Sequence, residues 1–181
     1  MCIRDRRILV VIFVLYSFSS LAQDNYNVEF AKILNTYRRE HNLNPVYIDT
    51  TLKPFADSHS VYMAKIDEVT HGENEYEFLK RWKRFSKSKY FGGENCTKLL
   101  ILPKSNTRNV KTSIDEITTV ISRISRNGPT VEDVSLYTFL MWKYSPSHNK
   151  FLLDPKIKYF YLSITKKNLW YYCEFVSYGD W

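Results

Sequence analysis

Residues 158–176 read KYFYLSITKKNLWYYCEFV, with Lys166-Lys167-Asn168 between two runs of β-branched and aromatic residues. Such runs are typical of β-strands, and a short polar connection between two of them is typical of a β-hairpin. The two runs, Lys158–Ile164 and Leu169–Val176, therefore predict an antiparallel pair of strands near the end of the sequence.

The sequence before this hairpin has helical periodicity instead. Four segments repeat apolar residues three and four positions apart, which predicts helices with one buried face. These segments are Asn27–His41, Thr51–Glu68, Ser113–Arg126 and a last helix that begins at Thr130 and ends near Tyr144. Helices first and strands later, without regular βαβ alternation, predict an α+β fold with an antiparallel sheet.

The first 22 residues predict an export signal. Three arginines precede the apolar run Ile8–Tyr16, and small residues follow as far as Ala22. That run is too short to span a bilayer permanently, so we do not expect an integral membrane protein. We interpret 1–22 as a signal peptide and 23–181 as a single domain, and we expect a monomer that is secreted or periplasmic.

The formal net charge is +7, and loss of the three arginines and one aspartate of the signal leaves +5. The densest basic cluster is Lys80–Lys89. We interpret this cluster as a solvated surface segment, with an anionic partner as the alternative. We expect no nucleic acid partner, because an exported protein has little access to one.

Two cysteines, Cys96 and Cys173, remain after the signal. An even number of cysteines in an oxidising compartment permits a disulfide, and we expect Cys96 to pair with Cys173. The alternative is two buried free thiols, which is a common state for cysteine.

Histidines are few, so each can be considered separately. We expect His71 on a turn after the second helix, His148 just past the last helix, and Glu94 on a glycine-rich turn. Two imidazoles and a carboxylate suit a divalent metal such as zinc, or a general base with its orienting partner. Three unrelated surface residues are the alternative. His59 lies on an apolar helix stripe, and we interpret it as a core histidine rather than a site residue.

Several motifs, in this order along the chain, resemble those of the CAP superfamily (cysteine-rich secretory proteins, antigen 5 and pathogenesis-related 1). Residues Trp142–Pro155 are similar to the pattern Trp-x-x-Ser-Pro-x-His-x-x-x-Leu-x-x-Pro of bacterial members. The other matching segments are Asn35–Asn42, Asp49–Ala64, His71, Gly93-Glu94-Asn95 and Trp170–Phe175. The likeness extends from about Asn27 to Val176.

The resemblance implies a three-layer α-β-α sandwich with a central antiparallel sheet. It also implies a cleft with two histidines and two acidic residues, which binds a divalent metal in some members. By position, His71 and His148 are the two histidines and the expected zinc ligands. Glu94 is one acid and the candidate catalytic residue. Ser145 stands in the cleft where the second acid is expected, so the set is incomplete in this sequence.

The resemblance implies a secreted binding or interaction module rather than a conventional enzyme. Its ligand would be a divalent metal, a small hydrophobic molecule such as a lipid, or a cell-surface glycan. An aromatic content of 16% agrees with such a contact surface. The alternative is a metal-dependent hydrolase that acts on peptide or cell-envelope polymer, with Glu94 as ligand or base. A third interpretation gives His71, Glu94 and His148 a purely structural role.

Overall fold

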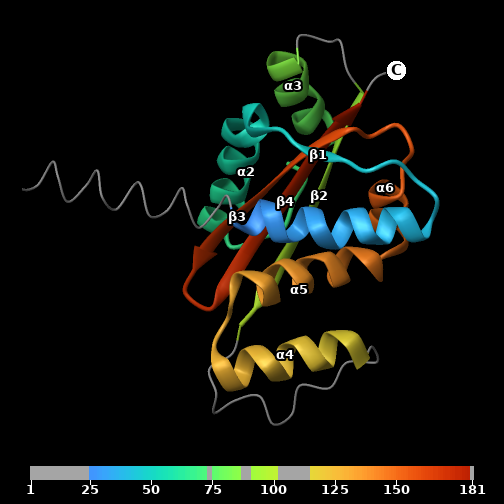
Figure 1. The fold of residues 1–181 in the computed structure, drawn as a ribbon. Helices are drawn as coiled ribbons and strands as arrows, with labels where there is room; N and C mark the ends of the chain where they lie inside the picture. Colours follow the sequence, from blue (N-terminus) through green and yellow to red (C-terminus); the bar gives the residue numbers. More distant parts are fainter. Residues whose placement is uncertain (1–24, 73–74, 87–90, 102–114, 180–181) are drawn as a thin grey trace, which may run out of the picture.

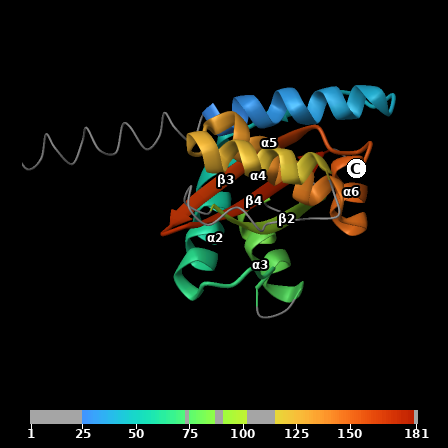
Figure 2. The ribbon, with the colours of Figure 1, turned by 90° about the horizontal axis from the view of Figure 1, so that it is seen from below.

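The computed structural model of the protein describes residues 25–72, 75–86, 91–101 and 115–179. The predicted signal peptide lies outside these ranges. Helices cover both faces of a central sheet, which gives the expected three-layer α-β-α sandwich (Figures 1 and 2). None of the helices within the described ranges is long and apolar enough to cross a bilayer.

The central sheet, as far as the described ranges go, has four strands in the order β1-β3-β4-β2. Their bounds are Tyr47–Ile48 (β1), Phe91–Leu100 (β2), Tyr159–Lys167 (β3) and Trp170–Gly179 (β4). Strands β3 and β4 form the predicted hairpin, and β2 pairs antiparallel with β4. Two of the three strand pairs are antiparallel, as predicted, and the short β1 adds one parallel pair with β3, so the sheet is mixed. No tight turn joins β1 to β3, so nothing local imposes an antiparallel direction on this pair.

The helices divide into two layers (Figure 2). One face of the sheet is covered by α2 (Lys53–Ile66) and α3 (Glu75–Ser86). The other face is covered by a first helix over residues 25–40 and by α5 (Val131–Lys143), with α4 (Asp115–Asn127) packed against α5. A 3-10 turn, Thr50–Leu52, precedes α2. The four predicted helices are therefore confirmed, with small differences at their ends.

Two helices were not predicted. Helix α3 includes part of the basic cluster that we interpreted as a solvated surface segment, and it forms because Phe78 and Trp82 pack on Phe55 of α2, with ring centroids 5.9 and 5.7 Å apart. Helix α6 (Pro146–Leu152) begins at a proline, which is favoured in a first helical turn. His148 therefore lies within a helix and not on a turn.

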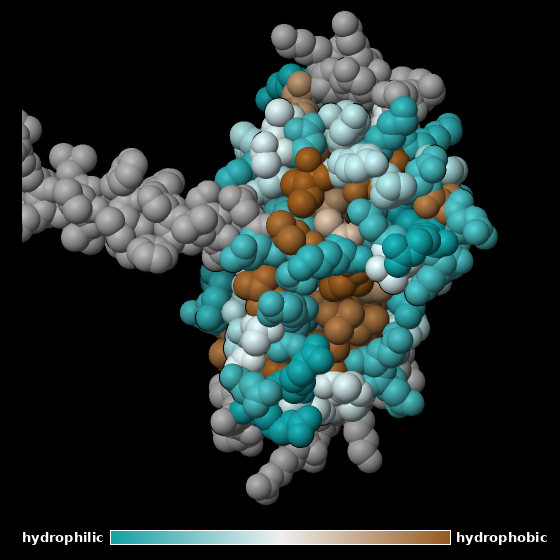
Figure 3. All heavy atoms as spheres, in the orientation of Figure 1, coloured by the Kyte–Doolittle hydropathy of each residue, from teal (hydrophilic) through white to brown (hydrophobic). Residues whose placement is uncertain are grey.

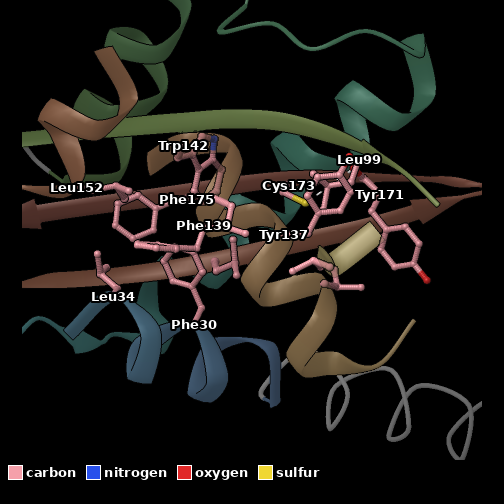
Figure 4. Close-up of a cluster of buried hydrophobic side chains, with 14 of the residues drawn as sticks. Phe30, Leu34, Leu99, Tyr137, Phe139, Trp142, Leu152, Tyr171, Cys173 and Phe175 are labelled. Carbon is pink, nitrogen blue, oxygen red and sulfur yellow. Dashed lines mark hydrogen bonds between the residues drawn. The ribbon is translucent and has the colours of Figure 1, made fainter. Parts of the chain in front are cut away.

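The main core lies between the sheet and the layer of the first helix and α5. Figure 4 shows Phe30 and Trp142 directed toward Phe175 of β4, with ring centroids 5.6 Å (Phe30) and 5.9 Å (Trp142) from that of Phe175. Burial of each such side chain stabilises the fold by about 1.5–3 kcal/mol. The buried indole N–H of Trp142 also donates to the carbonyl oxygen of Cys96 at 3.4 Å, which connects α5 to β2.

Cys96 and Cys173 do not form the predicted disulfide, and both are buried free thiols. In the register of β2 and β4, Cys173 lies opposite Thr97, whereas Cys96 lies opposite Glu174. Neighbouring positions of a strand point to opposite faces, so the two thiols lie on opposite sides of the sheet. Cys96 faces α2, and the sulfur of Cys173 lies 3.5 Å from the hydroxyl oxygen of Thr138 in α5.

Candidate functional site

Glu94 is the centre of a charged cluster on the face of β2 that packs against α2 and α3. Its side chain is 2% exposed, and both carboxylate oxygens are paired. Nδ1 of His71 donates to Oε1 at 3.1 Å, and Nη2 of Arg81 donates to Oε2 at 3.0 Å. Burial raises the pKa of Glu94, but the bond from His71 and the charge of Arg81 outweigh burial and leave the pKa below its usual value.

Glu94 lies inside a strand and not on the turn that the glycines predicted. Gly92 and Gly93 serve close packing instead of turn geometry. A Cβ on Gly92 would lie 2.2 Å from the ring of Trp82, and a Cβ on Gly93 would lie 2.5 Å from the ring of Phe151. The two glycines therefore let α3 and α6 approach the backbone of β2 from opposite faces.

His71 lies on a bend after α2, as predicted, with 51% of its side chain exposed. The bend is held by Thr70, whose hydroxyl accepts from the backbone N–H of Gly72, and Gly72 has a φ of 106° that suits glycine. The hydrogen bond to Glu94 raises the pKa of His71 against the opposite effect of partial burial. The imidazole is therefore held in one orientation with its outer edge in solvent.

His148 lies in the first turn of α6, and Ser145 occupies the N-cap position of that helix. The side-chain amide of Asn95 in β2 donates to the backbone carbonyl oxygen of His148 at 3.2 Å. Partial burial and the nearby His71 lower the pKa of His148. The structure thus brings His71 and Glu94 into direct contact and places His148 within electrostatic range of His71.

Two charged members of the cluster, Arg81 and Glu174, were missed in the sequence. Glu174 is 0% exposed and lies opposite Cys96, so its side chain shares the face of Glu94. Burial and the negative charge of Glu94 raise the pKa of Glu174 well above its usual value. The two carboxyl groups approach each other, yet neither oxygen of Glu174 makes a well-aligned hydrogen bond to a described residue.

A usable signal for Glu174 was present in the sequence. The strand alternation of Trp170–Phe175 gives Tyr172 and Glu174 the same face of the sheet, and a charged residue among buried aromatic neighbours is unusual. Arg81 gave no such signal, because it stands in a run of exposed basic residues.

His59 is a buried histidine, as predicted, with 4% of its surface exposed. Its Nε2 donates to the carbonyl oxygen of Thr70 at 2.7 Å, and burial lowers its pKa. Its ring also lies beside the charged cluster. Ligand atoms of His59, Glu94 and Cys96 lie within 4.8 Å of one another, so this group could hold a metal ion.

Surface grooves occur on the opposite helical layer. Hydrophobic side chains are visible between polar ones on the face formed by the first helix, α5 and α4 (Figure 3). A groove of about 480 Å³ between the first helix and α5 is lined by Ile33, Leu136 and Phe139, among others. A second, of about 340 Å³, lies between α4 and α5. Neither groove includes a member of the charged cluster.

Residues 32–176 match the model of the cysteine-rich secretory protein family, CAP. No curated protein sequence matches the chain. The fold is similar to an outer surface protein from Borrelia burgdorferi, with 14% identity, a TM-score of 0.60, and coverage of 88% of this chain and 95% of the other.

Two longer bacterial proteins are also similar in fold. One is an extracellular SCP-domain protein from Bacillus anthracis, with 16% identity, a TM-score of 0.54, and coverage of 85% of this chain and 41% of the other. The other is a cysteine-rich secretory protein from Staphylococcus aureus, with 13% identity, a TM-score of 0.50, and coverage of 87% of this chain and 39% of the other. The family match and the shared fold establish that this chain belongs to the CAP family.

Proposed function

We propose that this protein is an exported binding module whose site lies at the edge of the sheet, where His71 and His148 flank the buried Glu94. The observation that carries the proposal is the pairing of Glu94 on both oxygens. A carboxylate stabilised by Arg81 and His71 has a lowered pKa and is a weak general base near neutral pH. The cluster is therefore better suited to fixing His71 for a ligand than to accepting a proton from a substrate.

A divalent metal fits the donor groups of this site. Imidazole and carboxylate are ligands that zinc accepts, and the lowered pKa of His148 favours the neutral imidazole that binds metal. Bound zinc would supply a Lewis-acidic centre at the sheet edge. A small hydrophobic molecule or a cell-surface glycan is the other kind of ligand that the resemblance implies.

Export is part of the same proposal. The pattern of residues 1–22 supports it, and two of the proteins with a similar fold are described as an outer surface protein and an extracellular protein. In this proposal the mature chain, 23–181, is a monomeric single domain.

Calorimetric titration of zinc into the mature protein tests the function. We expect one-to-one binding that weakens at least about tenfold in His148→Ala. His41→Ala is the matched control, because His41 is an exposed histidine in the turn that follows the first helix and its Nδ1 is bonded to the carbonyl oxygen of Tyr37. Equal affinity in wild type and His148→Ala would exclude His148 as a ligand. Absence of zinc binding would exclude the metal and leave lipid and glycan ligands to be tested.

A metal-dependent hydrolase of peptide or cell-envelope polymer is the second candidate, and the buried Glu174 favours it. Glu94 and Glu174 have pKa values displaced in opposite directions, which is typical of a base and its acid partner. This candidate predicts that Glu94→Gln abolishes hydrolysis of cell-envelope polymer while circular dichroism shows a retained fold. A turnover rate unchanged by the substitution would rule the hydrolase out.

A further inference from the structure

A buried polar layer lies beneath His71 on the α2 face of the sheet. Glu94 and Cys96 are alternate residues of β2 and therefore share this face. Glu174 of β4 lies directly opposite Cys96. His59 projects from α2 into the same layer, with ligand atoms of His59, Glu94 and Cys96 within 4.8 Å of one another.

We propose that this layer is a thiolate-containing metal site, in which Cys96, His59 and Glu94 bind a zinc ion. The inference rests on the proposed metal-binding function and moves the metal inward, from the partly buried His148 to the buried Cys96. It also assigns a function to two residues that the site at the sheet edge does not use.

His71 lies next to two of these ligands, Glu94 and Cys96, but stands outside the group whose ligand atoms all lie within 4.8 Å of one another. Its Nδ1 lies 3.1 Å from Oε1 of Glu94 and 3.9 Å from the sulfur of Cys96. Tetrahedral zinc, with bonds of about 2.0 Å to nitrogen and oxygen and about 2.3 Å to sulfur, separates such donors by about 3.3 and about 3.5 Å. The observed separations differ from these values by only a few tenths of an ångström.

The hydrogen bond of His59 leaves one of its ring nitrogens available to a metal. The bond from Nε2 to the carbonyl oxygen of Thr70 places the proton on Nε2 and leaves Nδ1 unprotonated. A metal-binding histidine commonly donates its other ring N–H to a backbone carbonyl, which fixes its tautomer and orientation.

The charges in the layer balance when a dication is present. Ionised Glu94, Glu174 and Cys96 carry three negative charges, and Arg81 with a divalent metal carries three positive charges. Without the metal, the oxygens of Glu174 and Nη1 of Arg81 are buried without a well-aligned hydrogen bond to a described residue. Buried polar atoms in that state are costly, and a cation beside Glu174 would stabilise its carboxylate oxygens.

Cobalt(II) titration of the reduced mature protein, followed by absorption spectroscopy, tests this site. We expect a thiolate-to-cobalt charge-transfer band that saturates at one equivalent and disappears when zinc is added. Cys96→Ser should lose the band and bind cobalt at least about tenfold more weakly. Cys173→Ser is the matched control, because Cys173 is also a buried thiol but lies on the opposite face of the sheet, and it should keep both band and affinity.

A second variant keeps the test valid if Cys96→Ser folds poorly. Glu174→Gln retains every proposed ligand and removes only the counter-charge, so it should keep the band and bind more weakly. Wild-type binding without a thiolate band would overturn the thiolate site, and loss of that binding in His148→Ala would leave the proposed function standing. No binding of cobalt or zinc by wild type would overturn the thiolate site and would exclude the metal from the proposed function, leaving its lipid and glycan ligands.

Discussion

Nδ1 of His71 donates a hydrogen bond to Oε1 of Glu94 over 3.1 Å, joining the bend after α2 to the edge strand β2. The pair is asymmetric, because the carboxylate is 2% exposed and the imidazole is 51% exposed. The carboxylate is thus fixed within the core, while the histidine that it orients meets solvent. This asymmetry makes the pair sensitive to pH.

Removal of His71 should destabilise the protein in a pH-dependent way. The pKa of His71 is raised in the folded state. Its contribution to stability is therefore complete below 6.5, its pKa in the unfolded chain, and is lost as pH rises through the folded pKa. The lowered pKa of Glu94 keeps the carboxylate ionised down to about pH 4.5 or lower. We expect His71→Ala to cost about 1 kcal/mol at pH 5.5, with solvent screening of the exposed imidazole included.

Urea unfolding at pH 5.5 and at pH 9 measures this difference. The cost of His71→Ala should shrink at the higher pH, where the imidazole is neutral in both states. An equal cost at both values would show that the histidine stabilises the fold by packing and not by its charge.

Loss of Arg81 should be more costly than loss of His71. Arg81→Ala leaves the buried Glu94 without one of its two partners, and breaking a buried ion pair costs about 3 kcal/mol. Arg84→Ala is the matched control on the same helix, because Arg84 is exposed and bonds the carbonyl oxygen of Lys80, and it should change stability by less than about 0.5 kcal/mol. Equal effects of the two substitutions in chemical denaturation would contradict the pairing of Arg81 with Glu94.

Glu174→Gln should stabilise the protein in the presence of a chelator, and increasingly so as pH rises. The raised pKa of Glu174 means that the folded state keeps a proton that the unfolded state releases above about pH 4.5. For each pH unit between 4.5 and the folded pKa, the free energy of unfolding of wild type therefore falls by up to about 1.4 kcal/mol relative to that of the variant. Denaturation curves between pH 4 and pH 8 measure how the stability of each protein changes with pH. The same pH dependence in wild type and Glu174→Gln would disprove a protonated Glu174.

Gly92→Ala should destabilise the α3 side of the sheet. The added Cβ would lie 2.2 Å from Trp82, whose ring is held by Phe55 and Phe78, and overpacking of this kind costs about 1–3 kcal/mol. Gly128→Asn is the control, because Gly128 follows α4 with open space around it and a φ of 83° that asparagine tolerates. Thermal unfolding should show a clear loss for Gly92→Ala and a smaller change for the control.

Part of the fold follows from local patterns. The strand alternation of β3 and β4 and the helical spacing of the first helix and of α2, α4 and α5 were all evident in the sequence. The hydroxyl of Thr130, where the last helix was predicted to begin, caps α5 by accepting from the backbone N–H of Asp133. Helix α3 was hidden because half of its residues are charged, and only its contact with Phe55 reveals its apolar face.

The composition of the site depended on register and packing. The motif positions of His71, Glu94 and His148 were readable, because each belongs to a short segment with its own pattern. The arrangement of Cys96 opposite Glu174, and of Cys173 on the other face, depends on how β2 pairs with β4, which no single segment contains. Side-chain polarity encodes the period of a helix or strand locally, whereas strand register is a property of the whole fold. The sequence by itself therefore determined the elements and the motif residues, and the tertiary structure decided which side chains meet.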